Sequence, residues 1–168
     1  METIKTYDRF PSWIVATSNL LSLLIYGLGF AILLLINTLL ASIYLAFVLS
    51  LEIRIIRNHC INCYYYGKTC GFGKGRISAL LFKKGDSSRF CTMKITWKDM
   101  IPDMLVVIIP LIVGIILLIK DFDYKILIAI ALLLFLATMG NGFVRGTLTC
   151  KYCKQREIGC PADKLFNK

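Results

Sequence analysis

The sequence predicts an all-α membrane protein: four transmembrane helices form two tandem parallel hairpin repeats, each followed by a cytoplasmic C-x2-C-x6-C segment. Three observations lead to this prediction. Hydrophobic residues make up 57% of the 168-residue chain, compared with roughly 45–50% in soluble domains. The hydrophobic residues are concentrated in long stretches without charge, and the same cysteine spacing occurs twice.

The first two spans come from a single uncharged run. Residues 10–51 contain no charged side chain, which makes the run 42 residues long. One straight helix of that length would reach roughly 63 Å, whereas the hydrocarbon core of a bilayer is about 30 Å thick. The run must therefore fold back once, and the reversal is expected between Gly27 and Asn37.

The other two spans lie in the second half of the chain. Residues 104–119 and 126–144 are apolar and are separated by the charged turn KDFDYK. Each run approaches the roughly 17–25 residues that a spanning helix needs. With four spans, both termini and the central loop share one side of the membrane.

The basic residues predict the orientation of these spans. Of the 20 Lys and Arg residues, only Lys120 and Lys125 lie on the side opposite the termini. The positive-inside rule then places both termini and the central loop in the cytoplasm. The net charge of +10 is explained by this topology and by contact with anionic lipid headgroups, so we expect no nucleic-acid partner.

The two halves, residues 1–98 and 99–168, repeat the same order of features. Three of the four cysteines in the first half match the three of the second half at a separation of 90 residues, and the D-x-x-P motifs that begin at Asp8 and Asp99 match at 91. We interpret each D-x-x-P as a helix start, with Asp as the cap and Pro in the first turn. The same spacing maps the KDFDYK turn onto about residues 30–35 of the first half. Because each half crosses the membrane twice, the two units point the same way.

The six repeated cysteines are the candidate metal ligands: Cys60, Cys63, Cys70, Cys150, Cys153 and Cys160. The cytosol keeps thiols reduced, so clustered cysteines there favour metal binding or redox chemistry over structural disulfides. Zinc sites and iron–sulfur clusters both take four thiolates from C-x2-C turns. The expected cofactor is therefore zinc or an iron–sulfur cluster, and the spacing does not choose between them.

Two arrangements of the ligands are open. In one, both C-x2-C pairs form a single four-thiolate site. In the other, each half holds three thiolates, and the first half could be completed by Cys91 or His59. These two residues are secondary candidates because neither recurs in the other half, where Thr149 stands in the position of His59.

The features favour a non-catalytic role as an anchor, accessory or electron-transfer subunit of a larger complex with membrane or cytoplasmic partners. One alternative is a transporter or relay for a soft metal ion, because thiolates select such ions. A second alternative is a membrane thiol oxidoreductase that uses the C-x-x-C pairs. The sequence shows no Ser/His/Asp set or paired acids that would predict an enzymatic activity, and His59 is its only histidine.

Overall fold

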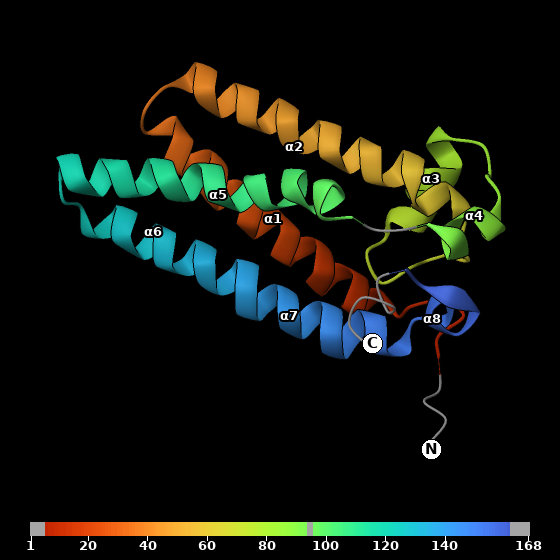
Figure 1. Ribbon diagram of the computed structural model, residues 1–168. Coiled ribbons are helices and arrows are strands. Elements are labelled where there is room, and N and C mark those ends of the chain that lie inside the picture. The colour runs from red at the N-terminus through yellow and green to blue at the C-terminus, as the bar shows by residue number, and fades with distance from the viewer. Residues whose placement is uncertain (1–5, 94–95, 162–168) are drawn as a thin grey trace. The chain divides into compact units, whose positions relative to one another are not determined.

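The computed structural model describes residues 6–93 and 96–161, and its regular elements are helical (Figure 1). It contains four helical segments that are long and apolar enough to cross a membrane, which agrees with the four predicted spans. They are Ser12–Leu34, Thr38–Asn62, Lys98–Lys120 and Tyr124–Tyr152.

The chain forms two compact units, and each unit draws on both halves of the sequence. Unit 1 consists of Met1–Asn19, Ile53–Thr96 and Phe143–Lys168. Unit 2 consists of Leu20–Glu52 and Trp97–Gly142. Unit 2 therefore holds most of the apolar helical residues, and unit 1 holds all the cysteines.

Unit 2 contains most of two helical hairpins, whereas the start of α1 and the end of α2 belong to unit 1. The first is formed by α1 (Ser12–Leu34) and α2 (Thr38–Asn58), and the second by α5 (Trp97–Lys120) and α6 (Tyr124–Phe135). The two hairpin turns lie at the same end of this unit, and α1 and α5 both run toward that end (Figure 1).

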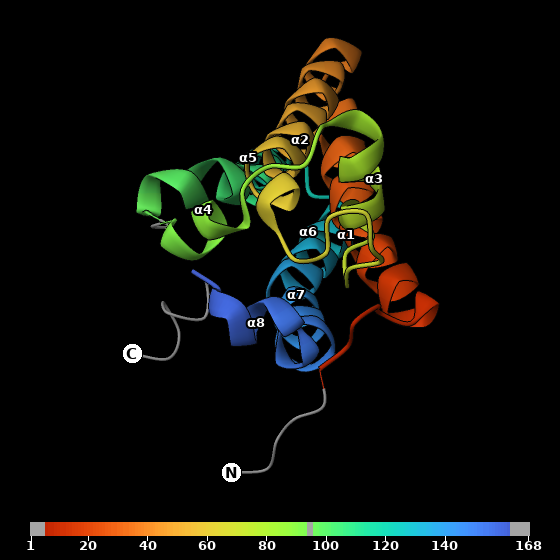
Figure 2. The same cartoon turned by 90° about the vertical axis from the view of Figure 1, so that its right-hand side faces the viewer.

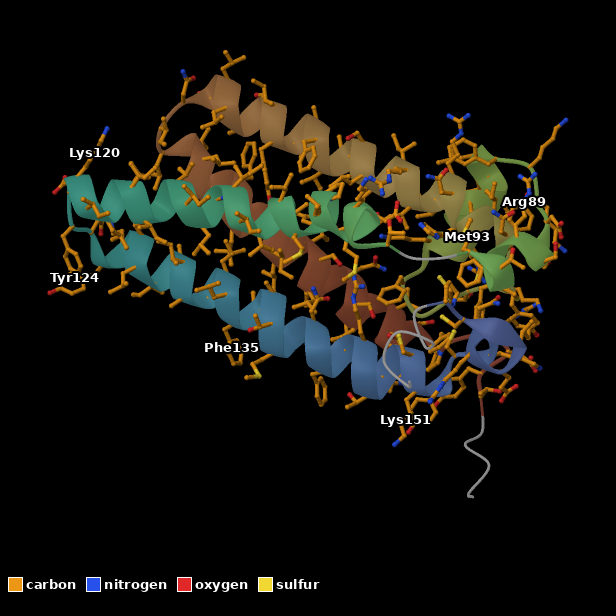
Figure 3. All side chains as sticks on the ribbon, viewed as in Figure 1. Arg89, Met93, Lys120, Tyr124, Phe135 and Lys151 are labelled. Carbon is orange, nitrogen blue, oxygen red and sulfur yellow. The ribbon has the colours of Figure 1, made fainter. Side chains whose placement is uncertain are left out.

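Each hairpin turn ends in a residue that caps the following helix. The Asn37 side chain accepts a hydrogen bond from the N–H of Leu39 at 2.9 Å, at the start of α2. Asp123 accepts one from the N–H of Lys125 at 2.8 Å, at the start of α6. Lys120 flanks this second turn (Figure 3). These side chains satisfy N–H groups that have no partner within the helix.

The helices of unit 2 approach closely at small residues. A Cβ at Gly114 of α5 would lie 2.7 Å from Ile130 Cδ1 of α6, so a larger residue there would force the Ile130 side chain to move. Tyr44 of α2 is buried, and its hydroxyl donates to the carbonyl of Val106 in α5 at 3.0 Å. Small residues and interhelical hydrogen bonds are the usual means by which membrane helices associate.

The first turn lies at residues 35–37, inside the expected interval but later than the repeat spacing implies. The equivalence with residues 30–35 is wrong, because α1 continues helically to Leu34. The separation of 90 residues between the cysteines is still kept because the fourth span is longer. Four more residues lie between its turn and Cys150 than lie between the first turn and Cys60. That span includes α7 (Asn141–Phe143) and two π-helical segments, η2 (Leu136–Gly140) and η3 (Val144–Thr149). A π turn accommodates extra residues within a continuous helix.

The D-x-x-P motifs do not start the helices as expected. The helix α1 begins at Ser12, after both Asp8 and Pro11. The helix α5 begins earlier, which puts Asp99 in its first turn and Pro102 inside it. The two motifs therefore occupy different positions relative to their helices.

Unit 1 contains short elements around the cysteines. They are η1 (Cys60–Asn62), α3 (Lys74–Leu81), α4 (Ser87–Thr92), η4 (Cys150–Tyr152) and α8 (Lys154–Gly159). Helices α4 and α8 contact each other, and Figure 2 shows them side by side. Phe10, Ile14 and Tyr65 are buried at the centre of this unit, where they pack against Cys63 and Cys153. One aromatic core thus joins the two cysteine-containing segments.

Candidate functional site

The two C-x2-C segments adopt the same local fold. In each, the first cysteine starts a 3₁₀ turn, and the second donates its N–H to the carbonyl of the first at 3.3 Å: Cys63 to Cys60, and Cys153 to Cys150. The residue before each turn has nearly equal backbone angles, φ −110° and ψ −50° in the first segment and φ −109° and ψ −63° in the second. Each segment places two thiols on one tight turn, as a chelating cysteine pair requires.

The two segments are joined by a reciprocal pair of hydrogen bonds. The backbone N–H of Lys154 donates to the Tyr65 hydroxyl at 3.0 Å. The backbone N–H of Tyr64 donates to Oε1 of Gln155 at 2.7 Å. Positions 64 and 154, and likewise 65 and 155, are 90 residues apart. In each segment, the side chain two positions after the second cysteine accepts a hydrogen bond from a backbone N–H of the other segment.

The sulfurs of Cys63 and Cys153 have matching surroundings. Burial is the main cause that raises the pKa of each of these thiols to about 12, and neighbouring cysteine thiols add to the effect. Hydrogen bonds from the backbone N–H of Tyr65 to Cys63 and of Gln155 to Cys153 lower each pKa without outweighing burial. Without a bound metal, both thiols are therefore protonated at neutral pH. Such N–H donors are also the groups that stabilise a metal-bound thiolate.

The third cysteine of each half lies near the same turns. The Cys70 sulfur accepts a hydrogen bond from the N–H of Gly75, at the start of α3, at 3.3 Å. Its thiol also helps to raise the pKa of Cys63. Cys160, which follows α8, raises the pKa of both Cys63 and Cys153. All six repeated cysteines thus lie in unit 1, and the thiols of the other four raise the pKa of Cys63, of Cys153 or of both.

The N-terminal segment runs between the two halves of the site. The N–H of Tyr7 donates to the carbonyl of Tyr152 at 3.0 Å, and the N–H of Phe10 donates to that of Thr69 at 2.9 Å. The Tyr65 hydroxyl donates to the Tyr7 carbonyl at 2.5 Å. Residues 7–10 therefore fasten the first cysteine segment to the second.

Asp8 has an electrostatic role in place of the expected capping role. Its carboxylate pairs with the Lys154 ammonium at 2.5 Å and accepts a hydrogen bond from the Tyr64 hydroxyl at 2.8 Å. These two contacts, with Lys154 the stronger, lower the pKa of Asp8. The Lys68 ammonium lies 3.9 Å from the centre of the Tyr64 ring, which adds a cation–π contact.

The secondary candidates lie at the edge of this cluster. The Cys91 thiol of α4 contacts the second segment: it donates to the carbonyl of Ile158 at 3.7 Å and accepts from Nε2 of Gln155 at 3.9 Å. The sequence predicts Cys91 as a candidate fourth ligand of the first half, whereas the structure places it beside α8. The His59 ring packs edge-on against Phe90, with ring centroids 6.5 Å apart.

Cysteine thiolates are suitable ligands for a soft metal, but the thiols that the structure describes do not point toward one common centre. Within residues 6–93 and 96–161, no three His, Cys, Asp or Glu side chains are grouped closely enough to hold a metal ion. Zinc and iron–sulfur centres need four thiolates converging on them. The cysteines would have to change rotamer, or their turns shift, to close such a site.

Sequence reasoning missed the two residues that link the segments. Tyr65 and Gln155 are almost fully buried, at 2% and 3% exposure. Their equivalence was visible in the separation of 90 residues, but a tyrosine and a glutamine share no motif.

Comparisons with protein-family models, with curated proteins and with solved structures found no match.

Proposed function

We propose that this integral membrane protein holds a zinc ion or an iron–sulfur cluster in its cytoplasmic cysteine unit. It serves as an anchor, accessory or electron-transfer subunit of a larger complex. The observation that carries the proposal is that two C-x2-C turns of similar backbone geometry are linked to each other by hydrogen bonds. The candidate ligands are Cys60, Cys63, Cys70, Cys150, Cys153 and Cys160. Zinc would cross-link the turns, whereas an iron–sulfur cluster would also carry an electron.

The reciprocal hydrogen bonds support a site shared by both segments. The donors of these two bonds are the backbone N–H groups of Lys154, which follows Cys153, and of Tyr64, which follows Cys63. A metal with ligands from both segments would bind between turns that these hydrogen bonds already hold together. This favours the four-thiolate arrangement across the halves over two separate three-thiolate sites.

Thiol oxidoreductase activity is less well supported. An attacking thiol works best when its pKa lies near the ambient pH, because the thiolate is the nucleophile. Burial instead raises the pKa of both Cys63 and Cys153 to about 12. A soft-metal transporter is also less well supported, because all seven cysteines belong to unit 1 and none lies in unit 2.

The proposal includes the topology inferred from the charge distribution. The repeats comprise residues 1–98 and 99–168, both termini are cytoplasmic, and the turn after Lys120 faces the opposite side. Anionic lipids contact the basic cytoplasmic segments. This orientation places the cysteines in a reducing compartment, where metal binding competes well with disulfide formation.

The test is metal analysis of full-length protein purified anaerobically without chelators or a polyhistidine tag. We expect zinc or iron in stoichiometric amounts, with a broad visible absorption band if an iron–sulfur cluster is present. Cys150→Ser should lower the metal content, whereas Cys91→Ser, a change in the same unit, should not. Wild-type protein that contains neither zinc nor iron would overturn the proposal.

A further inference from the structure

Helix α3 has an inner face of small residues and an outer face of large apolar ones. Gly75 and Ser78 are buried, and the Ser78 hydroxyl donates to the Gly75 carbonyl at 2.8 Å. On the other side, Ile77, Leu80 and Leu81 are 44%, 85% and 58% exposed. The inner face holds α3 against the cysteine segment, which leaves the outer face open to its surroundings.

A pocket of about 390 Å³ lies between α3 and the start of α1. Its polar side chains are those of Ser12 and Asn19 from α1, Thr69 from the loop, and Arg76 from α3. None of its lining residues, all within the described part of the chain, is acidic. The pocket therefore combines one guanidinium with hydroxyl and amide donors.

The rest of the pocket is apolar or carries further positive charge. Phe72 and Ile77 are among its apolar lining residues, and Ile77 continues into the exposed face of α3. The Arg145 guanidinium lies 5.5 Å from the centre of the Phe72 ring, so a second cation stands beside the wall. The exposed residues Lys83 and Lys84 follow α3 directly.

This combination matches an anionic amphiphile. A guanidinium and neighbouring hydroxyl donors suit the oxygens of a phosphate. Exposed Ile77 and Leu80 suit the apolar part of the same molecule. A soluble anion would not account for these side chains, and Ile77 lines the pocket together with Ser12, the first residue of the apolar segment Ser12–Leu34.

We propose that the pocket binds the headgroup of an anionic phospholipid from the surrounding leaflet. Arg76 contacts the phosphate together with Thr69 and Ser12. Ile77 and Leu80 contact the glycerol and upper acyl region. The proposal rests on the membrane placement proposed above but requires no metal, because none of the lining residues is a cysteine or histidine.

The test is native mass spectrometry of the full-length protein in a neutral detergent, titrated with phosphatidylglycerol or phosphatidylcholine. We expect phosphatidylglycerol to bind more tightly than phosphatidylcholine. Arg76→Gln should weaken binding of phosphatidylglycerol about tenfold, as expected when one charge-assisted phosphate contact is lost. The matched control, Arg89→Gln, removes the same charge from α4 outside the pocket and should leave binding unchanged (Figure 3).

Three results would overturn the proposal. The first is equal binding of the two lipids. The second is an equal effect of Arg76→Gln and Arg89→Gln, which would indicate attraction to net charge alone. The third is displacement of the lipid by millimolar inorganic phosphate, which would indicate a site for a soluble anion. A second variant, Leu80→Ser, should also weaken lipid binding, because it removes an apolar contact from a side chain that the fold leaves exposed.

Discussion

The Tyr65 hydroxyl accepts a hydrogen bond from the backbone N–H of Lys154 at 3.0 Å and thereby joins two cysteine segments that are far apart in the sequence. Lys154 is the first residue of α8, so its N–H has no partner within that helix. The same hydroxyl donates to the carbonyl of Tyr7. One buried side chain thus satisfies backbone groups from two other parts of the chain.

Tyr65→Phe should therefore weaken the link without changing the shape of the core. It leaves the N–H of Lys154 and the carbonyl of Tyr7 without their partner, at a cost of about 1–3 kcal/mol for each group that stays buried. Hydrogen exchange should become at least about tenfold faster in α8. Tyr152→Phe is the control, since Tyr152 packs in the same cluster through its ring. Equal effects of the two substitutions would contradict the role assigned to the Tyr65 hydroxyl.

Gly71→Ala should disturb the contact between the two halves of unit 1. A Cβ at this position would lie 2.8 Å from Cγ2 of Thr149, the residue just before the second cysteine segment. Overpacking of this kind costs about 1–3 kcal/mol. We expect Gly71→Ala to lower the thermal midpoint of unfolding. The control Gly142→Ala should leave that midpoint unchanged, because its Cβ would meet no atom within 4 Å. A variant Gly71→Ala as stable as wild type would show that the halves are not packed closely here.

The Asp8–Lys154 pair predicts a definite pH dependence. Its contacts lower the pKa of Asp8 from the ordinary value of 3.8, so their stabilisation is present above that pH and is lost as the pH falls through the lowered pKa. They raise the pKa of Lys154 from 10.5, so the stabilisation is present below that pH and is lost as the pH rises through the raised pKa. The effect is small, because Asp8 is 70% exposed.

Thermal midpoints of wild type and Asp8→Asn measured across the pH range would check this dependence. The midpoint of wild type should exceed that of Asp8→Asn by a constant small amount through neutral pH. The difference should shrink at both extremes. A difference that instead grew in acid would contradict the assigned pairing.

The proposed orientation predicts which turn can be labelled from outside the cell. Phe122, between α5 and α6, is 59% exposed. In intact cells, Phe122→Cys should react with a membrane-impermeant maleimide, whereas Lys84→Cys should react only after the membrane is opened. Wild type provides the background, since all its cysteines lie on the proposed cytoplasmic side. The reverse labelling pattern would invert the topology.

The four helices could be predicted because lipid imposes a simple requirement on sequence. A run such as residues 10–51 has 42 residues without a charged side chain, which is too long for one spanning helix and therefore predicts two. The helices α1 and α2 meet at residues 35–37, within the expected interval. The exact turn was not predictable from the repeat, because the fourth span has four more residues between its turn and Cys150 than lie between the first turn and Cys60, and it includes two π-helical segments.

The repeated C-x2-C spacing could be read from the sequence, but the contacts between the two cysteine segments could not. The two similar 3₁₀ turns, Cys60–Asn62 and Cys150–Tyr152, agree with the equal spacing, although ψ is 151° at Cys63 and 119° at Cys153. The links through Tyr65 and Gln155 arise from packing between distant segments, for which the sequence has no short-range signal. Asp8 was misassigned for the same reason, since its partner Lys154 is 146 residues away.

The central claim is that the repeated cysteines, and no other side chains, hold a metal. X-ray absorption at the zinc or iron edge of anaerobically purified, full-length wild-type protein tests it most directly. We predict a first shell made only of sulfur, at about 2.3 Å. A first shell dominated by nitrogen or oxygen at about 2.0–2.1 Å would contradict the claim, because it would place the metal on other ligands.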